Sequence, residues 1–324
     1  IIASPRSSVE DNIGIFNLSK KVNTKYVSSA YLNNISYYKS LTNRLGYLSS
    51  SSNIWNLEKS SCNVVISSNI TEDNNLISLP IKKASKENSD LIVIDPREID
   101  LTRYAKLWIK PFPGTEGLVI NTISKIIFDQ NLENKDLNLD ELDKFKKFMW
   151  NFDPIKISAI TKVPQDQLYK AAELISKSKK TSFTFGQDTI NDSDTENYID
   201  AIYNLAVITD NLEGEGKGLY PTFNGIGSAS FYEIFESNKQ PFSTTKEIVK
   251  KIKDKTIKAL IIFGDGINLD ITFENSLDVI SKNLDVLVYA NHLKNNLFDI
   301  SDFIVPTKTY AEQESTVINL AGKI

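Results

Sequence analysis

Two polar motifs have the side chains that nucleotide binding requires, and each lies at the end of a short apolar run. Ser68 and Asn69 follow the run at 63–67, and Asp95 and Arg97 close the next run along the chain. Small side chains let a backbone approach a phosphate, a carboxylate accepts hydrogen bonds from a sugar hydroxyl or a guanine edge, and a guanidinium pairs with an anion. These motifs therefore predict a nucleotide-like ligand.

A third motif, Gly114, Thr115 and Glu116, stands at the expected start of a helix. In open parallel sheets the loops, helix N-termini and strand-end side chains converge at the carboxyl edge, where nucleotides bind. Each motif alone also fits a simpler interpretation, because Asp95 with Arg97 could be a turn with a surface ion pair and Thr115 could cap a helix. The order of the three motifs favours the binding site.

The elements that would position these motifs alternate between strands and helices. Short β-branched runs predict buried parallel strands at 63–67, 91–95, 182–185, 259–263 and 286–289. Helices are predicted at about 7–21, 115–130, 138–150, 165–178, 194–211 and 244–254. The pattern predicts an α/β fold of Rossmann-like parallel sheets flanked by helices, and 324 residues favour two domains. The glycine-rich stretch from Gly214 to Gly227 is predicted to be a loop that joins the domains.

Composition excludes several classes of function. The net charge of -4 and the scattered lysines give no basis for nucleic-acid binding, and no apolar run is long enough to insert into a membrane. Cys62 is the only cysteine, so this chain alone cannot ligate an iron–sulfur cluster or a cysteine-bound metal. We expect Cys62 to pack as a small hydrophobe.

Other polar residues are predicted to be structural. His292 follows a strand, but no Cys or Asp motif flanks it, so we expect no catalytic role. The carboxylate pairs Asp192 with Asp194 and Asp299 with Asp302 are interpreted as helix caps. No catalytic residue and no metal ligand is therefore predicted.

Taken in order, these motifs resemble the molybdopterin oxidoreductase superfamily, which includes formate dehydrogenases, nitrate reductases and the large iron–sulfur subunit of respiratory complex I. The motifs at 68–69, 95–97 and 113–116 resemble the dinucleotide-binding elements of that family, with Glu116 in place of the commoner Asp. The resemblance covers essentially the whole chain, and its further segments are 2–11, 204–218, 259–266 and 301–322.

The chain departs from the family where formate dehydrogenases have a Cys or selenocysteine followed by His. The resemblance places Asn33 and Asn34 there. An amide is a poor ligand for a redox metal and cannot take a proton as imidazole does. The loop at 221–227 has also lost the family's arginine. We expect Tyr31, Tyr37, Tyr38 and Tyr47 to fill the volume that a pterin would occupy.

These departures point to the complex I branch. The leading hypothesis is a non-catalytic structural and assembly module in the peripheral arm of NADH:ubiquinone oxidoreductase, with a vestigial dinucleotide cleft at Ser68, Asn69, Asp95, Arg97, Gly114, Thr115 and Glu116. The alternative is a formate dehydrogenase-like domain that binds a molybdenum pterin and has a divergent metal ligand. A third hypothesis is a nucleotide-binding module without redox chemistry.

The resemblance also implies the domains, cofactors, partners and location. We expect a central Rossmann-like domain at 31–235 and a discontinuous second α/β domain at 1–30 plus 236–324. No cofactor is expected in this chain, with iron–sulfur clusters in a partner region and molybdopterin only under the alternative. The expected partners are other peripheral-arm subunits, including the cluster-bearing part of the same subunit. The composition is typical of AT-rich genomes and suggests an organelle or a small bacterial genome. The resemblance to the peripheral arm of complex I implies the matrix side of the mitochondrial inner membrane or the cytoplasmic face of a bacterial membrane.

Overall fold

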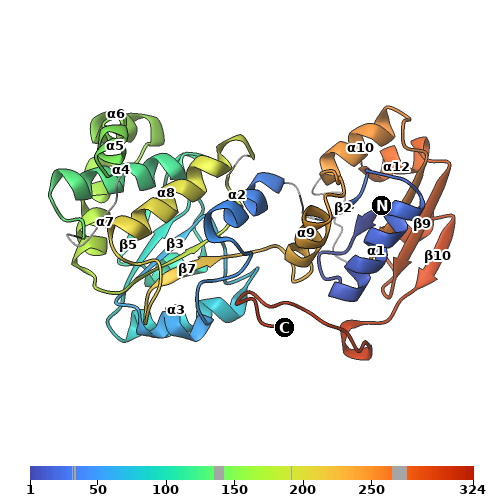
Figure 1. Cartoon of the computed structure of the whole chain (residues 1–324), viewed down its shortest axis with the longest axis horizontal. Helices are drawn as coiled ribbons and strands as arrows, with labels where there is room; N and C mark the ends of the chain where they lie inside the picture. The colour runs from blue at the N-terminus through green and yellow to red at the C-terminus, as the bar shows by residue number, and fades with distance from the viewer. Residues whose placement is uncertain (31, 33, 135–141, 191, 265–275) are drawn as a thin grey trace. The chain divides into compact units, whose positions relative to one another are not determined.

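The structure is a computed structural model that describes every residue except 31, 33, 135–141, 191 and 265–275. The chain divides into two compact units (Figure 1). Unit 1 comprises Ile1–Ile35, Phe223–Asn319 and Lys323–Ile324, and unit 2 comprises Ser36–Thr222 and Leu320–Gly322. Each unit contains a five-stranded sheet in which all the paired strands are parallel. The predicted α/β fold with parallel sheets flanked by helices is confirmed.

The sheet of unit 2 has the strand order β5-β4-β3-β6-β7. Its strands are β3 (Cys62–Ile66), β4 (Asp90–Ile94), β5 (Leu107–Ile109), β6 (Thr181–Phe185) and β7 (Gly218–Pro221). The chain runs outward from β3 to β5 on one side and from β6 to β7 on the other. The strand order therefore reverses between β3 and β6, which is where open α/β sheets form a crevice at their carboxyl edge.

Helices cover both faces of this sheet (Figure 1). The helices of unit 2 are α2 (Ile35–Leu45), α3 (Asn75–Lys86), α4 (Glu116–Asp129), α5 (Leu142–Met149), α6 (Pro154–Thr161), α7 (Gln165–Lys177) and α8 (Thr195–Ile208). Short 3-10 turns lie at Ile54–Lys59, Asp100–Tyr104 and Asp192–Asp194. Alternate side chains of the strands, such as Val65 and Val93, pack with Ile77 and Ile81 of α3, while α4, α7 and α8 form the layer on the other face. Cys62 is fully buried at the start of β3, as expected of a small hydrophobe.

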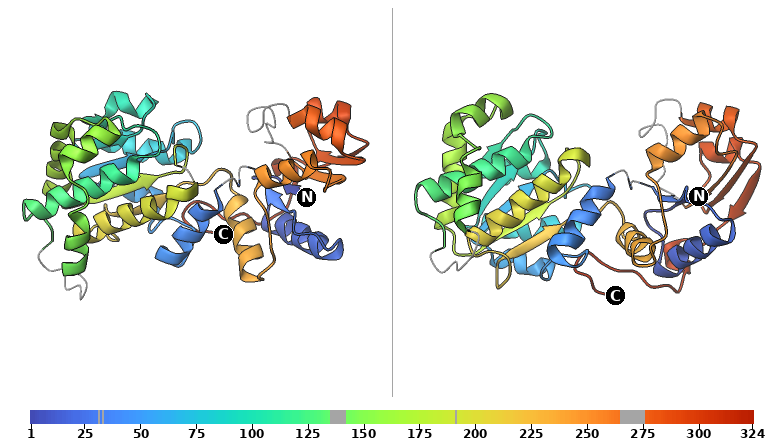
Figure 2. Two further views of the ribbon diagram at one scale, coloured as in Figure 1. Left: turned by 90° about the horizontal axis from the view of Figure 1, so that it is seen from above. Right: turned by 45° about the horizontal axis from the view of Figure 1, so that its top comes forward.

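The sheet of unit 1 has the strand order β10-β9-β8-β1-β2. Its strands are β1 (Ile2–Ala3), β2 (Ser28–Ser29), β8 (Ala259–Phe263), β9 (Val286–Asn291) and β10 (Phe303–Pro306). Its helices are α1 (Val9–Lys21), α9 (Ser228–Ser237), α10 (Thr245–Lys253), α12 (Ser276–Asn283) and α13 (Asn296–Ile300), with a 3-10 turn at Tyr310–Glu312. Ile248 and Ile252 of α10 pack against Leu260 and Ile262 of β8. Figure 2 shows α1 and α10 on opposite faces of this sheet.

Some predictions about local structure were wrong. The stretch predicted as a loop contains β7, which pairs with β6 along its whole length although it begins with Gly218 and ends with Pro221. Asp194 does stand at the N-cap position of α8, but its side chain accepts no capping hydrogen bond from the backbone. Asp302 is no cap either, because its Oδ2 accepts a hydrogen bond from the backbone N–H of Leu287, 2.7 Å away.

No helix among the described residues is long and apolar enough to cross a membrane.

Candidate functional site

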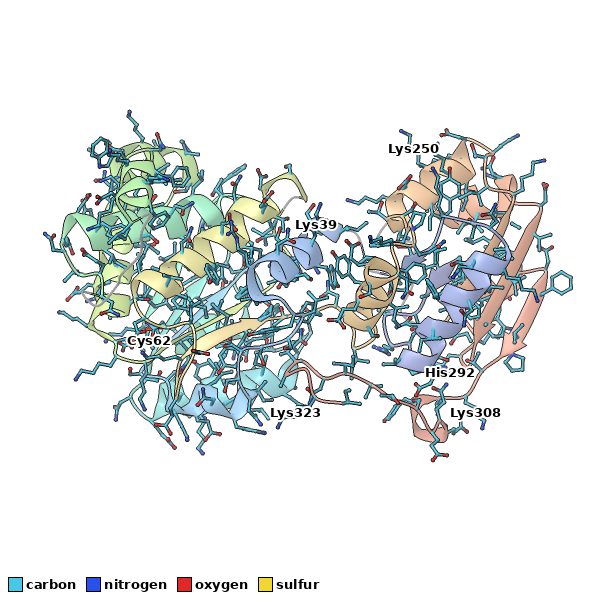
Figure 3. All side chains as sticks on the ribbon, in the orientation of Figure 1. Lys39, Cys62, Lys250, His292, Lys308 and Lys323 are labelled. Atoms are coloured by element: carbon cyan, nitrogen blue, oxygen red, sulfur yellow. The ribbon has the colours of Figure 1, made fainter. Side chains whose placement is uncertain are left out.

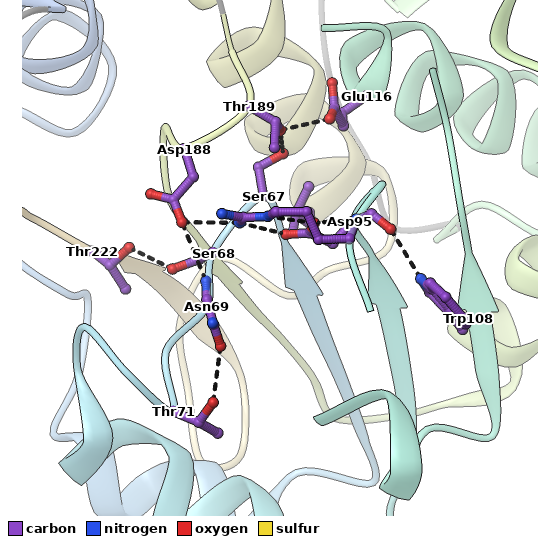
Figure 4. Close-up of polar contacts among 12 residues, drawn as sticks. Ser67, Ser68, Asn69, Thr71, Asp95, Trp108, Glu116, Asp188, Thr189 and Thr222 are labelled. Carbon is purple, nitrogen blue, oxygen red and sulfur yellow. Dashed lines mark hydrogen bonds and ion pairs between the residues drawn. The ribbon is translucent and has the colours of Figure 1, made fainter. Parts of the chain in front are cut away.

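The motifs that were identified in the sequence lie at the carboxyl edge of the unit 2 sheet (Figure 4). Ser67, Ser68 and Asn69 follow β3, and Asp95 follows β4. The side chain of Ser68 shares a hydrogen bond of 3.0 Å with the hydroxyl of Thr222, at the end of β7. The edge therefore brings together residues that are far apart in the sequence.

Asp95 and Arg97 form a bidentate ion pair that a backbone hydrogen bond supports. Arg97 donates to the Asp95 carboxylate from its backbone N–H at 2.8 Å, from Nε at 3.0 Å and from Nη2 at 2.9 Å. Asp95 is only 1% exposed, and Trp108 Nε1 donates to its backbone oxygen at 2.9 Å. The hydrogen bonds to Asp95 raise the pKa of Arg97 further above its ordinary value, with a smaller contribution from Asp188. Three hydrogen bonds therefore hold Arg97 against Asp95 at this edge.

Asp188 connects the ends of β6 and β3. Its Oδ2 accepts from Arg97 Nη2 at 3.0 Å and from the backbone N–H of Asn69 at 3.3 Å. A guanidinium and a free backbone N–H are donors that a phosphate oxygen also uses. The Asp188 carboxylate therefore occupies a position that suits an anion. Asp188 was not among the predicted site residues, although it follows the predicted strand at 182–185 by three residues.

Glu116 is the buried carboxylate of this edge. It is 0% exposed at the start of α4, and its Oε1 accepts from the hydroxyl of Thr189 at 2.6 Å. That hydroxyl also lies 2.9 Å from Ser67 Oγ. Glu116 Oε2 is buried and has no hydrogen-bond partner among the described residues. Burial raises the pKa of Glu116, and the hydrogen bond from Thr189 opposes that effect.

Gly114 and Thr115 form the turn before α4 rather than part of this network. Gly114 has a φ of +84°, and Thr115 donates from its hydroxyl to the backbone oxygen of Phe112 at 2.6 Å. Thr115 occupies the N-cap position without a capping hydrogen bond from its side chain. Gly114 reaches this network only through its backbone, whose hydrogen bond to the Glu116 carboxyl partly opposes the rise that burial causes in the pKa of Glu116, and the hydroxyl of Thr115 bonds to Phe112 instead.

The edge is also tightly closed around Gly186 and Tyr37. A Cβ at Gly186 would lie 2.9 Å from the backbone oxygen of Ser67 and 2.8 Å from Thr222 Oγ1, so only glycine allows these strand ends to meet. The hydroxyl of Tyr37 lies 3.2 Å from the backbone oxygens of both Phe185 and Thr222, to which it donates.

The tyrosines were expected to fill the volume of a pterin, and they behave differently from one another. Tyr37 and Tyr38 are fully buried, whereas Tyr47 is 42% exposed and fills no interior volume. Tyr31 and Asn33 lie outside the described residues, and Asn34 is 7% exposed.

Carboxylates outnumber cations at this edge. Burial raises the pKa of Asp73, and the nearby Asp188 and Glu72 raise it further, while Arg97 lowers it. An edge of this charge favours ligand groups that donate hydrogen bonds, such as hydroxyls and amines. A phosphate would need the Arg97 and Asn69 donors that now bond to Asp188.

Unit 1 has a cavity of about 580 Å³ at the carboxyl edge of its own sheet. Ser4, Gly264, His292 and Thr307, which directly follow β1, β8, β9 and β10, contribute to its wall. A Cβ at Gly264 would lie 2.5 Å from the Cβ of Ser4, so glycine is needed at this close approach.

Cations and hydroxyls line this cavity. Arg6 and Lys308 contribute positive charge, and Ser4 and Ser7 contribute hydroxyls; Figure 3 labels His292 and Lys308. The guanidinium, ammonium and hydroxyl groups are donors for an anionic ligand, but the carboxylates of Glu10 and Asp11 also lie in the wall and balance the charges of Arg6 and Lys308. None of these strand ends was predicted to bind a ligand, so the cavity was not predicted from the sequence.

No group of three or more His, Cys, Asp or Glu residues that could hold a metal ion occurs in the part of the chain that the structure describes.

Comparison with known proteins assigns this chain to a protein family. The molybdopterin oxidoreductase family model matches residues 10–324, and the chain belongs to that family. The solved structure of acetylene hydratase from Pelobacter acetylenicus matches 96% of this chain and 49% of its own, with a TM-score of 0.71 and 16% identity.

Three relatives show how far the similarity extends. The F420-dependent formate dehydrogenase subunit alpha of Methanocaldococcus jannaschii is 23% identical, covering 100% of this chain and 54% of its own length. The NADPH-Fe(3+) oxidoreductase subunit alpha of Geobacter sulfurreducens is 24% identical, covering 99% and 41%. A putative formate dehydrogenase of Staphylococcus aureus is 23% identical, covering 100% and 36%. The chain thus spans between about a third and a half of these relatives.

Proposed function

We propose that this chain is the pterin-dinucleotide-binding part of a formate dehydrogenase-like molybdopterin oxidoreductase, with iron–sulfur clusters in a partner region of the assembly. The observation that carries the proposal is Glu116, a buried carboxylate whose Oε2 has no hydrogen-bond partner among the described residues. Buried polar atoms are normally paired, so an unpaired acceptor suits a ligand that donates. The amine of guanine is such a donor.

The rest of the unit 2 edge fits the other parts of a nucleotide. Ser68 lies at the strand end where a backbone meets a ligand, and Asp95 is an acceptor for a sugar hydroxyl once Arg97 turns toward a phosphate. Asn69 and Arg97 offer the phosphate donors, provided that Asp188 moves away from them. Binding therefore exchanges the Asp188 carboxylate for a ligand anion.

The cavity of unit 1 fits the phosphates of the same class of ligand. Arg6, Lys308 and His292 contribute donor groups to the wall of a space of about 580 Å³ at the end of parallel strands, which Glu10 and Asp11 also line. Each unit would then bind one nucleotide at its own carboxyl edge. A bound molybdenum pterin supplies two-electron redox chemistry, while this chain binds and orients its nucleotide parts. The names of the three relatives support this class of activity.

The second candidate is the non-catalytic module of the complex I peripheral arm, working with the other subunits of that arm. The amides of Asn33 and Asn34 at the family's metal-ligand and proton-acceptor positions favour it, as do the buried Tyr37 and Tyr38. The relatives support it less well, because they are formate dehydrogenase and NADPH-Fe(3+) oxidoreductase subunits. The two candidate functions share the fold, but only the first includes a bound molybdenum pterin.

The deciding experiment is metal and nucleotide analysis of the natively purified protein with its co-purifying chains. Stoichiometric molybdenum or tungsten, together with GMP released by acid hydrolysis, is expected under the first candidate. The matched variant Glu116→Leu should retain less GMP, whereas Glu98→Leu should retain as much as the unaltered chain. Absence of both metal and GMP, with respiratory-chain subunits co-purifying, would refute the first candidate in favour of the second.

A further inference from the structure

The helices α5 and α6 of unit 2 carry an exposed apolar surface that the proposed function does not use. Figure 1 shows both helices stacked on α4, away from the strands. Trp150 is 73% exposed, Ile155 67%, Phe112 62%, Ile160 54% and Phe148 51%. We call these five residues the apolar patch. Surface hydrophobes that occur singly are ordinary, whereas a contiguous group usually marks an interaction site.

Local contacts show that the members of the apolar patch are neighbours. Phe112 donates its backbone N–H to the oxygen of Thr161 at 2.7 Å, which places Phe112 beside the end of α6. Ile155 and the exposed Ala159 are one turn apart on α6, and Ile160 lies farther around the exposed surface of the helix, with the exposed Lys156 between Ile155 and Ile160. At the other end, Trp150 precedes α6 by four residues in a tight turn.

The opposite side of α6 is already buried. Ile157 packs in a cluster with Met149 and Phe152, and Leu118 and Phe128 close that cluster from α4. Helix α6 is therefore apolar on two sides, which is typical of a helix that is covered on both. Its outer side lacks a cover among the described residues.

Exposed lysines lie close in sequence to the residues of the apolar patch. Lys147, Lys156 and Lys162 are exposed, and none of them pairs with a carboxylate within the described part of the chain. The nearby Asp153 is used as the N-cap of α6, where it accepts from the backbone N–H of Ile155 at 2.8 Å. The rim of the apolar patch is therefore positive.

The charge of the rim narrows the choice of occupant. A second copy of this chain would place lysines against lysines, which is unfavourable. An anionic membrane would attract the lysines, but α6 has only eight residues and Phe112 comes from a separate loop, so no long amphipathic helix lies flat on this face. An apolar centre with Trp and a charged rim is the usual anatomy of a protein interface.

We infer that the apolar patch binds a partner protein whose contact surface has an apolar centre and a rim of Asp and Glu side chains. The aromatic rings and isoleucines would fill the centre, and Lys147, Lys156 and Lys162 would pair with the acidic rim. The five apolar side chains expose on the order of 500 Å², if a fully exposed aromatic ring presents roughly 150–250 Å². That area is comparable with the centre of an interface of standard size.

Photo-crosslinking in the native assembly tests this inference. Ile155 is replaced by p-benzoylphenylalanine, and the matched control places the same residue at Tyr169, which is 43% exposed on α7. The expected result is a crosslink from position 155, and none from 169, to one polypeptide whose crosslinked peptide lies beside at least two surface carboxylates. A crosslink to a second copy, a lipid adduct or no crosslink would overturn the inference.

Charge reversal provides the second measurement. The double variant Lys147→Glu/Lys156→Glu should bind the crosslinked partner at least tenfold more weakly, while the control Lys86→Glu/Lys170→Glu should bind as the unaltered chain does. Equal binding by both variants would refute the acidic rim. Flotation with phosphatidylglycerol vesicles should leave the chain unbound, and flotation that the first double variant abolishes would assign the apolar patch to a membrane instead.

Discussion

The carboxyl edges of the two sheets have similar topology and opposite character. In unit 2 the strand ends are joined to each other, because Arg97 bonds to both Asp95 and Asp188 and Glu116 is buried. In unit 1 the strand ends border an open cavity of about 580 Å³ that Arg6 and Lys308 line. Both sheets reverse strand order at the centre, so topology places the crevice in each. The side chains then determine whether each crevice is closed or open. They also determine whether it favours ligand groups that donate hydrogen bonds or ligand groups that are anionic.

The largest expected effect concerns the strand end that keeps the unit 1 cavity open. Gly264→Ala should destabilise the protein by about 2–4 kcal/mol, because a φ of +79° strains an alanine and its Cβ would overlap Ser4. Urea unfolding measures the change. The control Gly14→Ala has nothing within 4 Å of the new Cβ and lies inside α1, so it should stabilise by about 0.5–1 kcal/mol. Equal effects of the two substitutions would contradict the close approach.

The next effect concerns the ion pair that closes the unit 2 edge. Arg97→Leu should lower the free energy of unfolding by about 1–3 kcal/mol, because it leaves the buried Asp95 without its bidentate partner. The exposed fraction of the Arg97 side chain, 45%, keeps the effect below that of a fully buried pair. The control Arg103→Leu removes an exposed pair with Asp100 and should change stability much less than Arg97→Leu does. Denaturant unfolding at neutral pH compares the two variants. If Arg97→Leu leaves the free energy of unfolding unchanged, the ion pair that closes the edge is not formed in solution.

Most strands of the two sheets could be predicted from the sequence. The side-chain contacts that close the carboxyl edge of unit 2 could not. Buried parallel strands are recognisable as short β-branched runs, so β3, β4, β6, β8 and β9 were predicted to within two residues at either end. The Asp188 contact depends on β6 lying beside β3, and the two strands are more than 110 residues apart in the sequence.

Other elements lack a local signal. The apolar face of α3 surrounds Pro80, which argues against a helix when only the sequence is considered. Strand β1 has two residues, and its partner β8 lies some 260 residues away. The cavity at their ends therefore becomes visible only in three dimensions.

Nucleotide binding tests whether the two edges differ in their anion sites. Asp188→Asn removes the carboxylate that bonds to Arg97 and Asn69, so GDP should bind to the unit 2 edge about tenfold more tightly, which corresponds to about 1.4 kcal/mol. Arg6→Gln should weaken GDP binding to unit 1 by a similar factor. Calorimetry at low ionic strength measures both, because salt screens these charges. An unchanged affinity of Asp188→Asn would show that the carboxylate does not compete with phosphate.

The smallest effect is a difference in pH dependence between a glutamate in each unit. The pKa of Glu116 is raised by burial, so the folded protein binds its proton more tightly than the unfolded chain does, and stability falls as pH rises from the ordinary value of 4.5 through the raised pKa. Glu116→Gln should therefore be more stable than the unaltered chain at pH 7, by on the order of 1 kcal/mol, since a neutral amide is easier to bury than a carboxylate. That gain should disappear below the ordinary pKa.

Glu10 of unit 1 should show the opposite sign. Hydrogen bonds from the hydroxyl and backbone N–H of Thr316 lower the pKa of Glu10 to about 2, so its contribution to stability is present above 4.5 and is lost as pH falls toward 2. Glu10→Gln should thus reduce stability slightly at pH 7 and leave it unchanged near pH 2. Unfolding of both variants across this pH range gives the comparison directly. Curves of the same sign would mean that the Glu116 carboxylate is hydrated or paired in solution, and the main observation behind the proposed donor-binding site would then fail.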